Sequence, residues 1–389
     1  MDPVHDKALR GEEAKIIRIV HVVSSLEIGG TQELLLDLIP RMDKTQFDNI
    51  ICTVSWKGLL AKEAEAKGIE VYDLAKGNRQ DIRAVFRLAA FARQRRVDII
   101  QGYNFSGNFW GGLGSKLSRV PVFLVTWHAP YTDLPSYKKA ISRMLSRLSK
   151  RIIVINEDIW KLWVDTYGFP AKKVALIDEG IDLDVYSGHV DRQAIAEELG
   201  LDPNRPVIGT IGRLDPQKGH SYLLEAFVSV LSACPQAQLL IIGDGKLRSQ
   251  LEEQARNLNI EGNVRFVGVR RDLVKIYALL DVFVMSSLWE GLPLVVLKAM
   301  AAKKPMVLTQ VGGIPEIVQH NRTGFLVPPA NPTALAEGII WMLENPEAAQ
   351  RLGNQAYKVV RDRFDIEKMV ERYQTLYREV LSDRSRDYK

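Results

Sequence analysis

The chain has 389 residues, of which 46% are hydrophobic and 25% charged, and its formal net charge is +5. This length is typical of two domains rather than one, and the composition is that of an ordinary globular protein. No run of about 18 apolar residues is present, so we expect no membrane-spanning helix, and so mild a charge gives no sign of nucleic-acid binding. Cys52 and Cys234 lie in separate segments, and we expect neither a disulfide nor a metal site.

Residues 1–14 are polar and lack the apolar core of an export signal, so we interpret them as a flexible leader. Apolar β-branched runs then alternate with amphipathic stretches. In the first half, strands are predicted at 16–23, 49–56, 97–101, 120–127 and 151–156. Near-continuous apolar strands separated by helices are typical of a parallel sheet covered on both faces.

The pattern is interrupted around 178–205 by turn residues, proline and a polar helix. A second series follows, with strands predicted within 205–214, 237–245, 263–269, 280–287, 304–310 and 323–329. We therefore predict an α/β protein with two doubly wound, Rossmann-like domains, 15–185 and 186–362, facing each other across a cleft. Segment 363–389 is predicted to be a helix crossing back to the first domain. Its apolar side comprises Ile366, Met369, Val370, Tyr373, Leu376, Tyr377 and Val380.

Ligands of doubly wound sheets bind outside the carboxyl ends of the strands, so candidate residues are sought there. In the second domain, Gly212 and Arg213 end the first strand, and Lys218 stands just before a helix. Two fixed cations suit a diphosphate, and each contact is worth up to about 4 kcal/mol before desolvation. The alternative is a solvated basic loop. After the next strand, Gly243 and Asp244 form a tight turn, in which Asp244 either caps the following helix or contacts a ligand.

Two further glycine turns and one histidine stand at strand ends. The amides of Gly312 and Gly313 can bind ligand hydroxyls or phosphate. Gly29 and Gly30 let the backbone approach a ligand, although a plain tight turn explains them equally well. His128 directly follows an apolar strand and can polarise a sugar or phosphate oxygen, the alternative being a structural histidine.

Two segments, 82–97 and 137–151, carry many Lys and Arg residues and no acid. In 137–151, an apolar stripe recurs at helical spacing and comprises Ile141, Met144, Leu145 and Leu148. Such a helix can lie on an anionic membrane surface. Alternatively, the stripe packs against the core and leaves a solvated basic back.

Several segments together carry a family resemblance over nearly the whole chain. They are "HVVSSLEIGGTQELLLDL", "GIDLDVY", "IGTIGRLDPQKGHSYLLEAF", "LLIIGDGKLRSQLEEQARNL", "VRFVGVRRDLVKIYALLDVFVMSSLWEGLPLVVLKAMA" and "PMVLTQVGGIPEIVQHNRTGFLVPP". The chain resembles the retaining glycosyltransferases of family four, of the group 1 type, which have the GT-B fold. The resemblance implies a nucleotide-diphosphate-sugar donor on the second domain, an acceptor on the first, and no metal or other cofactor.

The resemblance also implies roles for individual residues. Arg213 and Lys218 match the family's donor-phosphate cations, and His128 matches a histidine near the donor sugar. Glu290 matches the first acid of a Glu–seven residues–Glu motif that contacts this sugar. Residues matching the donor-binding loops are Gly29, Gly30, Gly212, Gly243, Asp244, Gly291, Leu292, Pro293, Gly312 and Gly313.

The chain departs from the family pattern at several positions. The family has a second glutamate where this chain has Lys298, and that glutamate accepts hydrogen bonds from the donor ribose, whereas a lysine can only donate. Losing each such contact costs about 1.5–3 kcal/mol. The other departures are Glu179 for asparagine, Asn156 for serine, and Tyr103 with Asn104 where relatives often carry histidine.

Three functions are compatible with these residues. The first is a metal-independent retaining transferase moving a hexose-type sugar, with uridine diphosphate as the expected nucleotide, to a glycan or lipid-linked acceptor in cell-surface polysaccharide synthesis. The second is a catalytically weak homologue that acts as a binding or scaffold subunit. The third is another GT-B enzyme, such as a nucleotide-sugar epimerase or a phosphorylase. For the first we expect a cytoplasmic protein, peripheral on the inner face of the plasma membrane, with no nucleic-acid partner.

Overall fold

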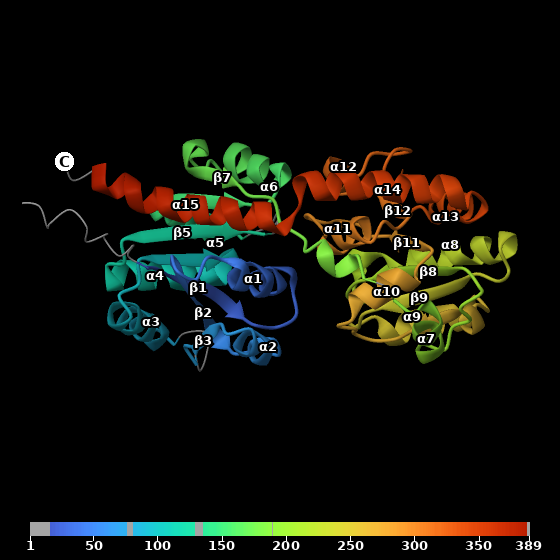
Figure 1. Ribbon diagram of the computed structural model, residues 1–389, viewed down its shortest axis with the longest axis horizontal. Helices are drawn as coiled ribbons and strands as arrows, with labels where there is room; N and C mark the ends of the chain where they lie inside the picture. Colours follow the sequence, from blue (N-terminus) through green and yellow to red (C-terminus); the bar gives the residue numbers. More distant parts are fainter. Residues whose placement is uncertain (1–15, 76–80, 129–134, 189, 387–389) are drawn as a thin grey trace, which may run out of the picture. The chain divides into compact units, whose positions relative to one another are not determined.

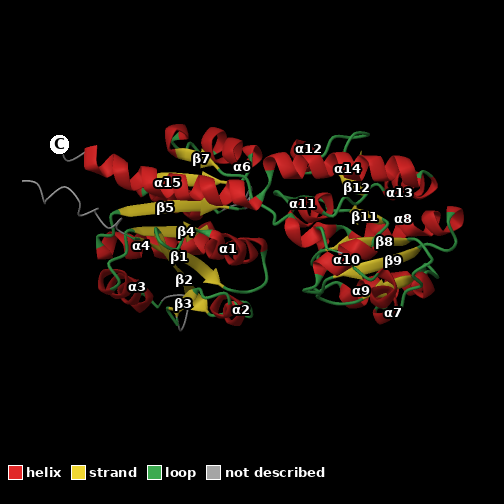
Figure 2. Cartoon of the chain, in the orientation of Figure 1, coloured by secondary structure: helices red, strands yellow, loops and turns green. Residues whose placement is uncertain are grey.

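The computed structural model describes residues 16–75, 81–128, 135–188 and 190–386. The chain folds into two compact units, Met1–Ile177 with Met369–Lys389, and Asp178–Lys368. Each unit is built on one parallel sheet with helices on both faces (Figures 1 and 2). The predicted leader, 1–14, lies outside the described residues.

The first unit has a seven-stranded parallel sheet in the order β3-β2-β1-β4-β5-β6-β7. Its strands are β1 (Ile17–Ser25), β2 (Phe47–Trp56), β3 (Glu70–Asp73), β4 (Ile99–Tyr103), β5 (Val122–Trp127), β6 (Arg151–Val154) and β7 (Val174–Leu176). Its helices are α1 (Gly30–Arg41), α2 (Ala61–Ala66), α3 (Arg83–Gln94), α4 (Asn104–Ser118), α5 (Ser136–Leu148), α6 (Glu157–Lys161) and most of α15 (Ile366–Arg386).

The second unit has a six-stranded parallel sheet in the order β10-β9-β8-β11-β12-β13. Its strands are β8 (Val207–Ile211), β9 (Gln238–Ile242), β10 (Val264–Phe266), β11 (Val282–Met285), β12 (Met306–Thr309) and β13 (Phe325–Val327). Its helices are α7 (Arg192–Glu198), α8 (His220–Ala233), α9 (Arg248–Asn257), α10 (Leu273–Leu279), α11 (Leu294–Ala301), α12 (Ile314–Ile317), α13 (Pro332–Glu344) and α14 (Pro346–Arg363).

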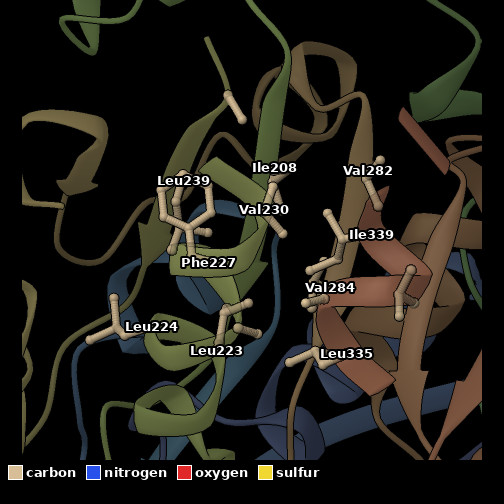
Figure 3. Packing of buried hydrophobic residues seen from close by; sticks show 14 of the residues in the cluster. Ile208, Leu223, Leu224, Phe227, Val230, Leu239, Val282, Val284, Leu335 and Ile339 are labelled. Atoms are coloured by element: carbon tan, nitrogen blue, oxygen red, sulfur yellow. The ribbon is translucent and has the colours of Figure 1, made fainter. Parts of the chain in front are cut away.

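Apolar side chains from two helices and the central strands form the core of the second unit. α8 and α13 lie side by side on the sheet, and Figure 3 shows Phe227 and Leu335 from these helices among the strand residues Ile208 and Val284. All four side chains are at least 98% buried. β8 and β11 are neighbours in the middle of this sheet. Because the core holds both strands in place, it also fixes the positions of their carboxyl ends.

The predicted α/β class is confirmed, and every strand predicted from an apolar run is present. Two strands that were not predicted, β3 and β7, are the edges of the first sheet. Both are short and only partly buried, so their residues show neither a long apolar run nor a clean alternation.

The division between the units differs from the predicted boundary at 185. It lies at Ile177, and residues 178–185 belong to the second unit. There Asp178 accepts a hydrogen bond from the Arg363 guanidinium at 2.7 Å, and the Ile181 amide donates to the Phe364 carbonyl at 2.7 Å. These contacts join the segment to the end of α14, which periodicity along the chain could not reveal.

The apolar side of the terminal helix is buried as predicted, from Ile366 to Val380. The chain rejoins the first unit at Met369 rather than at residue 363. Tyr377 fixes α15 there, because its hydroxyl donates to Gln101 Oε1 at 2.6 Å inside the core. No helix within the described ranges is long and apolar enough to cross a lipid bilayer.

Candidate functional site

Two pairs of loops touch at the carboxyl edge of the second sheet. The Gly212 amide donates to the Ile242 carbonyl at 2.9 Å, and the Gly313 amide donates to the Gly291 carbonyl at 2.9 Å. A Cβ atom on Gly312 would lie 2.1 Å from the Glu290 carbonyl oxygen, and the φ of Gly312 is +52°. Only glycine fits such a position, so the loops after β11 and β12 are held against each other by backbone contact.

Lys218 and Glu290 form the centre of this edge. Lys218 ends the turn Pro216–Lys218 after β8, and Glu290 lies in the loop after β11. Lys218 Nζ lies 2.5 Å from Glu290 Oε1, and the two side chains are only 16% and 7% exposed. Since β8 and β11 are adjacent, residues 72 positions apart in the sequence form a largely buried ion pair.

Two further side chains hold the Glu290 carboxylate. The Ser287 hydroxyl donates to Oε1 at 2.6 Å, and the Gln217 amide donates to Oε2 at 3.3 Å. Glu290 therefore accepts hydrogen bonds on both oxygens and has its charge balanced by Lys218. Such a carboxylate is fixed in position, which is what a residue that orients a ligand hydroxyl requires.

Arg213 is placed differently from Lys218. Its side chain is 72% exposed, and it pairs with Asp215 at 3.3 Å. It borders a pocket of about 550 Å³ that is lined by Arg213, Asp215, Pro216, Gln217, Asp244, Gly245, Lys246 and Trp289. This volume is within the range of small-molecule sites, about 300–1,000 Å³. Arg213 is thus accessible to an anion in this pocket, although it also donates to Gln217 Oε1 at 3.4 Å, whereas Lys218 is fixed beside Glu290.

The predicted helix cap at Asp244 is wrong. Its carboxylate accepts from the Gly245 amide at 2.7 Å and lies 3.7 Å from Arg248, while α9 begins after Leu247 without a side-chain cap. The tight turn itself is present, because a Cβ on Gly243 would lie 1.9 Å from the Gly212 carbonyl oxygen. Asp244 lines the pocket beside Arg213, so its predicted ligand contact remains a prediction.

Lys298 lies within α11, which begins directly after Pro293, and its side chain is partly buried. Leu292, before this proline, is 7% exposed and belongs to the core. The structure therefore places the segment from Glu290 to Lys298 as a loop leading into a short helix. The placement of residue 298 beside a donor ribose, where lysine replaces an accepting glutamate, stays a prediction.

The first unit has its own cluster at the carboxyl ends of β1, β4 and β5, which are adjacent strands. Asn104, which begins α4 with a φ of +54°, connects its members. Its amide nitrogen donates to the Thr31 hydroxyl at 3.2 Å, and its amide oxygen accepts from the His128 backbone at 3.1 Å. Thr31 follows Gly29 and Gly30 at the start of α1, so the predicted glycine turn and His128 share one connecting residue.

The ring of His128 lies beside Tyr103, a member of a buried polar pair. Its centroid is 5.8 Å from that of Tyr103, whose hydroxyl lies 2.9 Å from His21 Nδ1. Complete burial lowers the pKa of His21 to about 4 and raises the pKa of Tyr103 well above its ordinary value. Both groups therefore stay uncharged at neutral pH and present His128 with a neutral, rigid support.

Sequence reasoning missed Ser287, Gln217 and the connecting role of Asn104. A weak signal existed for Ser287, because it precedes Glu290 by only three residues in the loop after β11. Asn104 showed only as a departure from the family pattern, although asparagine tolerates a positive φ better than most residues. In the part of the chain that the structure describes, no group of three or more His, Cys, Asp or Glu side chains is placed to hold a metal ion.

Comparison with known proteins decides the family. Residues 191–359 match the model described as Glycosyl transferases group 1, and residues 28–185 match Glycosyltransferase Family 4. A D-inositol 3-phosphate glycosyltransferase of Corynebacterium efficiens is 30% identical over 68% of this chain and 67% of its own length. The chain belongs to the group 1 glycosyltransferases of family four.

Longer but more distant matches agree with this family. The UDP-Gal:alpha-D-GlcNAc-diphosphoundecaprenol alpha-1,3-galactosyltransferase of Escherichia coli is 25% identical over 93% of this glycosyltransferase and 96% of its own chain. The crystal structure of Anabaena HepE in complex with UDP and glucose is 22% identical, covers 94% of this chain and 100% of its own, and has a TM-score of 0.82. That likeness confirms the GT-B fold.

Proposed function

We propose that this glycosyltransferase moves a hexose-type sugar, with retention, from a uridine diphosphate sugar to a glycan or lipid-linked acceptor in cell-surface polysaccharide synthesis. The observation that carries the proposal is the buried Lys218–Glu290 pair beside Arg213 at the carboxyl edge of the second sheet. The Escherichia coli relative, whose name states a UDP-galactose donor and a diphosphoundecaprenol-linked acceptor, supports the donor and acceptor classes.

Lys218 and Arg213 stabilise the leaving group. Cleavage of the anomeric C–O bond places negative charge on the departing diphosphate and positive charge on the sugar ring. Lys218, held in a site from which most water is excluded, binds that developing charge strongly, and the exposed Arg213 turns from Asp215 to the outer phosphate. We propose that these cations neutralise the diphosphate, so that no metal ion or other cofactor is required.

Glu290 orients the donor sugar. Its carboxylate is fixed by Ser287 and Gln217 and can accept a hydroxyl hydrogen bond from the sugar. The acceptor hydroxyl then attacks the anomeric carbon on the face that the diphosphate leaves. As the new C–O bond forms, the bond to the diphosphate breaks, and a diphosphate oxygen takes the acceptor proton.

A sugar-binding role is proposed for the first-unit cluster. His128 would donate to the donor sugar, and the exposed amide of Gly30 at the start of α1 would contact donor or acceptor oxygens. Since a lipid-linked acceptor lies in a membrane, we place the reaction in the cytoplasm, at the inner face of the plasma membrane.

A screen of nucleotide sugars tests the proposal. Thermal shift identifies the donor that stabilises the protein, and mass spectrometry of products with candidate lipid-linked acceptors identifies the transfer. We expect stabilisation by uridine diphosphate sugars and transfer of one hexose. Nucleotide binding without turnover would instead indicate a binding subunit, and epimerised or phosphorolysed sugar without an acceptor would indicate another GT-B enzyme.

Arg213→Ala is expected to lower the turnover number at least about tenfold by removing one contact to the leaving diphosphate. Because this side chain is 72% exposed, the melting temperature should stay close to that of the unchanged protein. Steady-state kinetics with the identified donor measure the effect, and Arg256→Ala, an exposed position on α9, is the control. Near-native turnover would remove Arg213 from the diphosphate site.

Lys298→Glu is expected to strengthen uridine diphosphate binding by about tenfold, because a carboxylate accepts hydrogen bonds from ribose hydroxyls and lysine does not. Isothermal titration calorimetry measures the dissociation constant, and Lys275→Glu on the exposed side of α10 provides the same charge change elsewhere. If Lys298→Glu binds uridine diphosphate equally or more weakly, residue 298 does not face the ribose.

A further inference from the structure

Three neighbouring helices of the first unit contain no acidic residue. α4 packs between α3 and α5, and none of the three ranges, Arg83–Gln94, Asn104–Ser118 and Ser136–Leu148, includes an Asp or Glu. We call these helices the basic helix layer. Its cations are Arg83, Arg87, Arg93, Lys116, Lys138, Lys139, Arg143 and Arg147.

The apolar stripe of α5 faces the core only in part. Met144 and Leu148 are 46% and 54% exposed, while the buried positions of the helix are Ser142, Leu145 and Ser146. The interpretation of a core-facing stripe is therefore wrong for Met144 and Leu148, whereas Leu145 is buried as that interpretation requires. Small serines beside Leu145 let α5 pack closely on its neighbours, while Met144 and Leu148 are exposed beside Arg143 and Arg147.

The neighbouring helices repeat this arrangement. On α3, Phe86 is 60% exposed, and at the end of α4, Leu117 is 38% exposed, each within a turn of an exposed cation. Within the described residues of the second unit, the large apolar side chains that are exposed are few, namely Val185, Val269 and Trp289. In the first unit, other exposed apolar side chains, such as Ile28, Trp56 and Leu59, lie outside the basic helix layer. Those on the layer are Phe86, Leu117, Tyr137, Met144 and Leu148, and their position on three neighbouring helices marks a candidate interaction surface.

The chemistry of the layer selects its partner. The three helices carry eight cations and no acid, and of these cations Arg87 is paired with Asp81, just before α3, at 3.0 Å. A surface with such an excess of cations attracts an extended anionic surface, and outward Phe, Met and Leu side chains need an apolar phase to enter. A nucleic acid offers the phosphates without the apolar phase. We propose that the basic helix layer docks this protein on an anionic phospholipid bilayer, with Phe86, Met144 and Leu148 entering the acyl boundary.

This docking would bring the protein to the membrane that holds the proposed lipid-linked acceptor. Only this link to the acceptor rests on the proposed function. Binding to a bilayer needs no donor and no turnover. It can therefore be measured separately from transfer.

Co-sedimentation with vesicles tests the docking. The full chain is mixed with phosphatidylcholine vesicles or with phosphatidylcholine–phosphatidylglycerol vesicles, and we expect binding only to the second. Met144→Ser with Leu148→Ser should lower the partition coefficient by at least about tenfold. Arg83→Gln with Arg147→Gln should lower it by about fivefold for each charge removed, and added salt should weaken binding of the unchanged protein.

Matched variants in the second unit are the controls. Val269→Ser removes an equally exposed apolar side chain, and Arg256→Gln with Arg351→Gln removes two exposed charges, so neither should change vesicle binding. Equal binding to both vesicle types, or equal effects of layer and control variants, would overturn the proposal. A third result would also overturn it: the unchanged protein fails to bind vesicles and is a dimer, and the Met144→Ser, Leu148→Ser variant is a monomer. A second copy of the chain would then cover the stripe.

Transfer to a water-soluble acceptor separates the two proposals. The layer variants should retain this activity, because their side chains lie outside the proposed donor site. Vesicle binding without any transfer would count against the proposed function alone. Transfer without vesicle binding would count against the docking alone.

Discussion

Replacing Lys218 by alanine is expected to lower the turnover number by about a hundredfold to a thousandfold, because a preorganised group that binds developing negative charge has an effect of that size. The ammonium is already in place, 2.5 Å from Glu290 and 16% exposed, so it needs no reorganisation when the diphosphate departs. The Michaelis constant should change less than the turnover number. Single-turnover kinetics with the identified donor measure the chemical step.

The same change should also destabilise the second unit. It leaves Glu290, which is 7% exposed, without its counter-charge, and breaking a buried pair costs about 3–5 kcal/mol of unfolding free energy. Lys218→Met combined with Glu290→Gln removes both charges. We expect this double variant to recover most of the stability and none of the turnover, which distinguishes lost catalysis from lost folding.

Lys358→Ala, at an exposed position of α14, is the charge control and should behave as the unchanged protein. A folded Lys218→Ala variant with near-native turnover would remove Lys218 from the diphosphate site. The buried pair would then serve only to hold the loops after β8 and β11 together.

The positions of most strands along the chain could be predicted from the sequence because they depend on local periodicity. Apolar runs such as 205–214 and 280–287 gave the central strands β8 and β11, and the alternation of strands with helices gave the parallel sheets. Strand ends then indicated where Arg213, Lys218 and Glu290 would lie. The apolar side of α15 was predicted for the same reason, since its residues recur at helical spacing.

Side-chain partners and orientations could not be predicted, since they depend on tertiary packing. Nothing local to Lys218 shows that Glu290, 72 residues later, neutralises it, and nothing local to Asn104 shows that it joins Thr31 to His128. Helical spacing identified the stripe on α5 but not the direction in which it points. Serines at the core-facing positions were the available signal, and a periodicity based on large apolar residues overlooks them.

Gly312→Ala is expected to lower the free energy of unfolding by about 3 kcal/mol, because it adds a backbone clash to the strain of a positive φ. Its Cβ would lie 2.1 Å from the Glu290 carbonyl oxygen, which has no flexible side chain to move aside. The loop after β11 must therefore shift and carry the Glu290 carboxylate with it. Turnover should fall as well, although no charged group has been removed.

Gly200→Ala separates the clash from the strain. Gly200 lies in the same unit with a φ of +67°, but a Cβ there would come no closer than 3.8 Å to another group, the Arg265 side chain. This variant should lose about 1–2 kcal/mol, which is the cost of a left-handed backbone alone. Urea unfolding and steady-state turnover are measured for both variants. Equal losses in stability with unchanged turnover would mean that the loops after β11 and β12 separate without moving Glu290, and that their contact does not position the carboxylate.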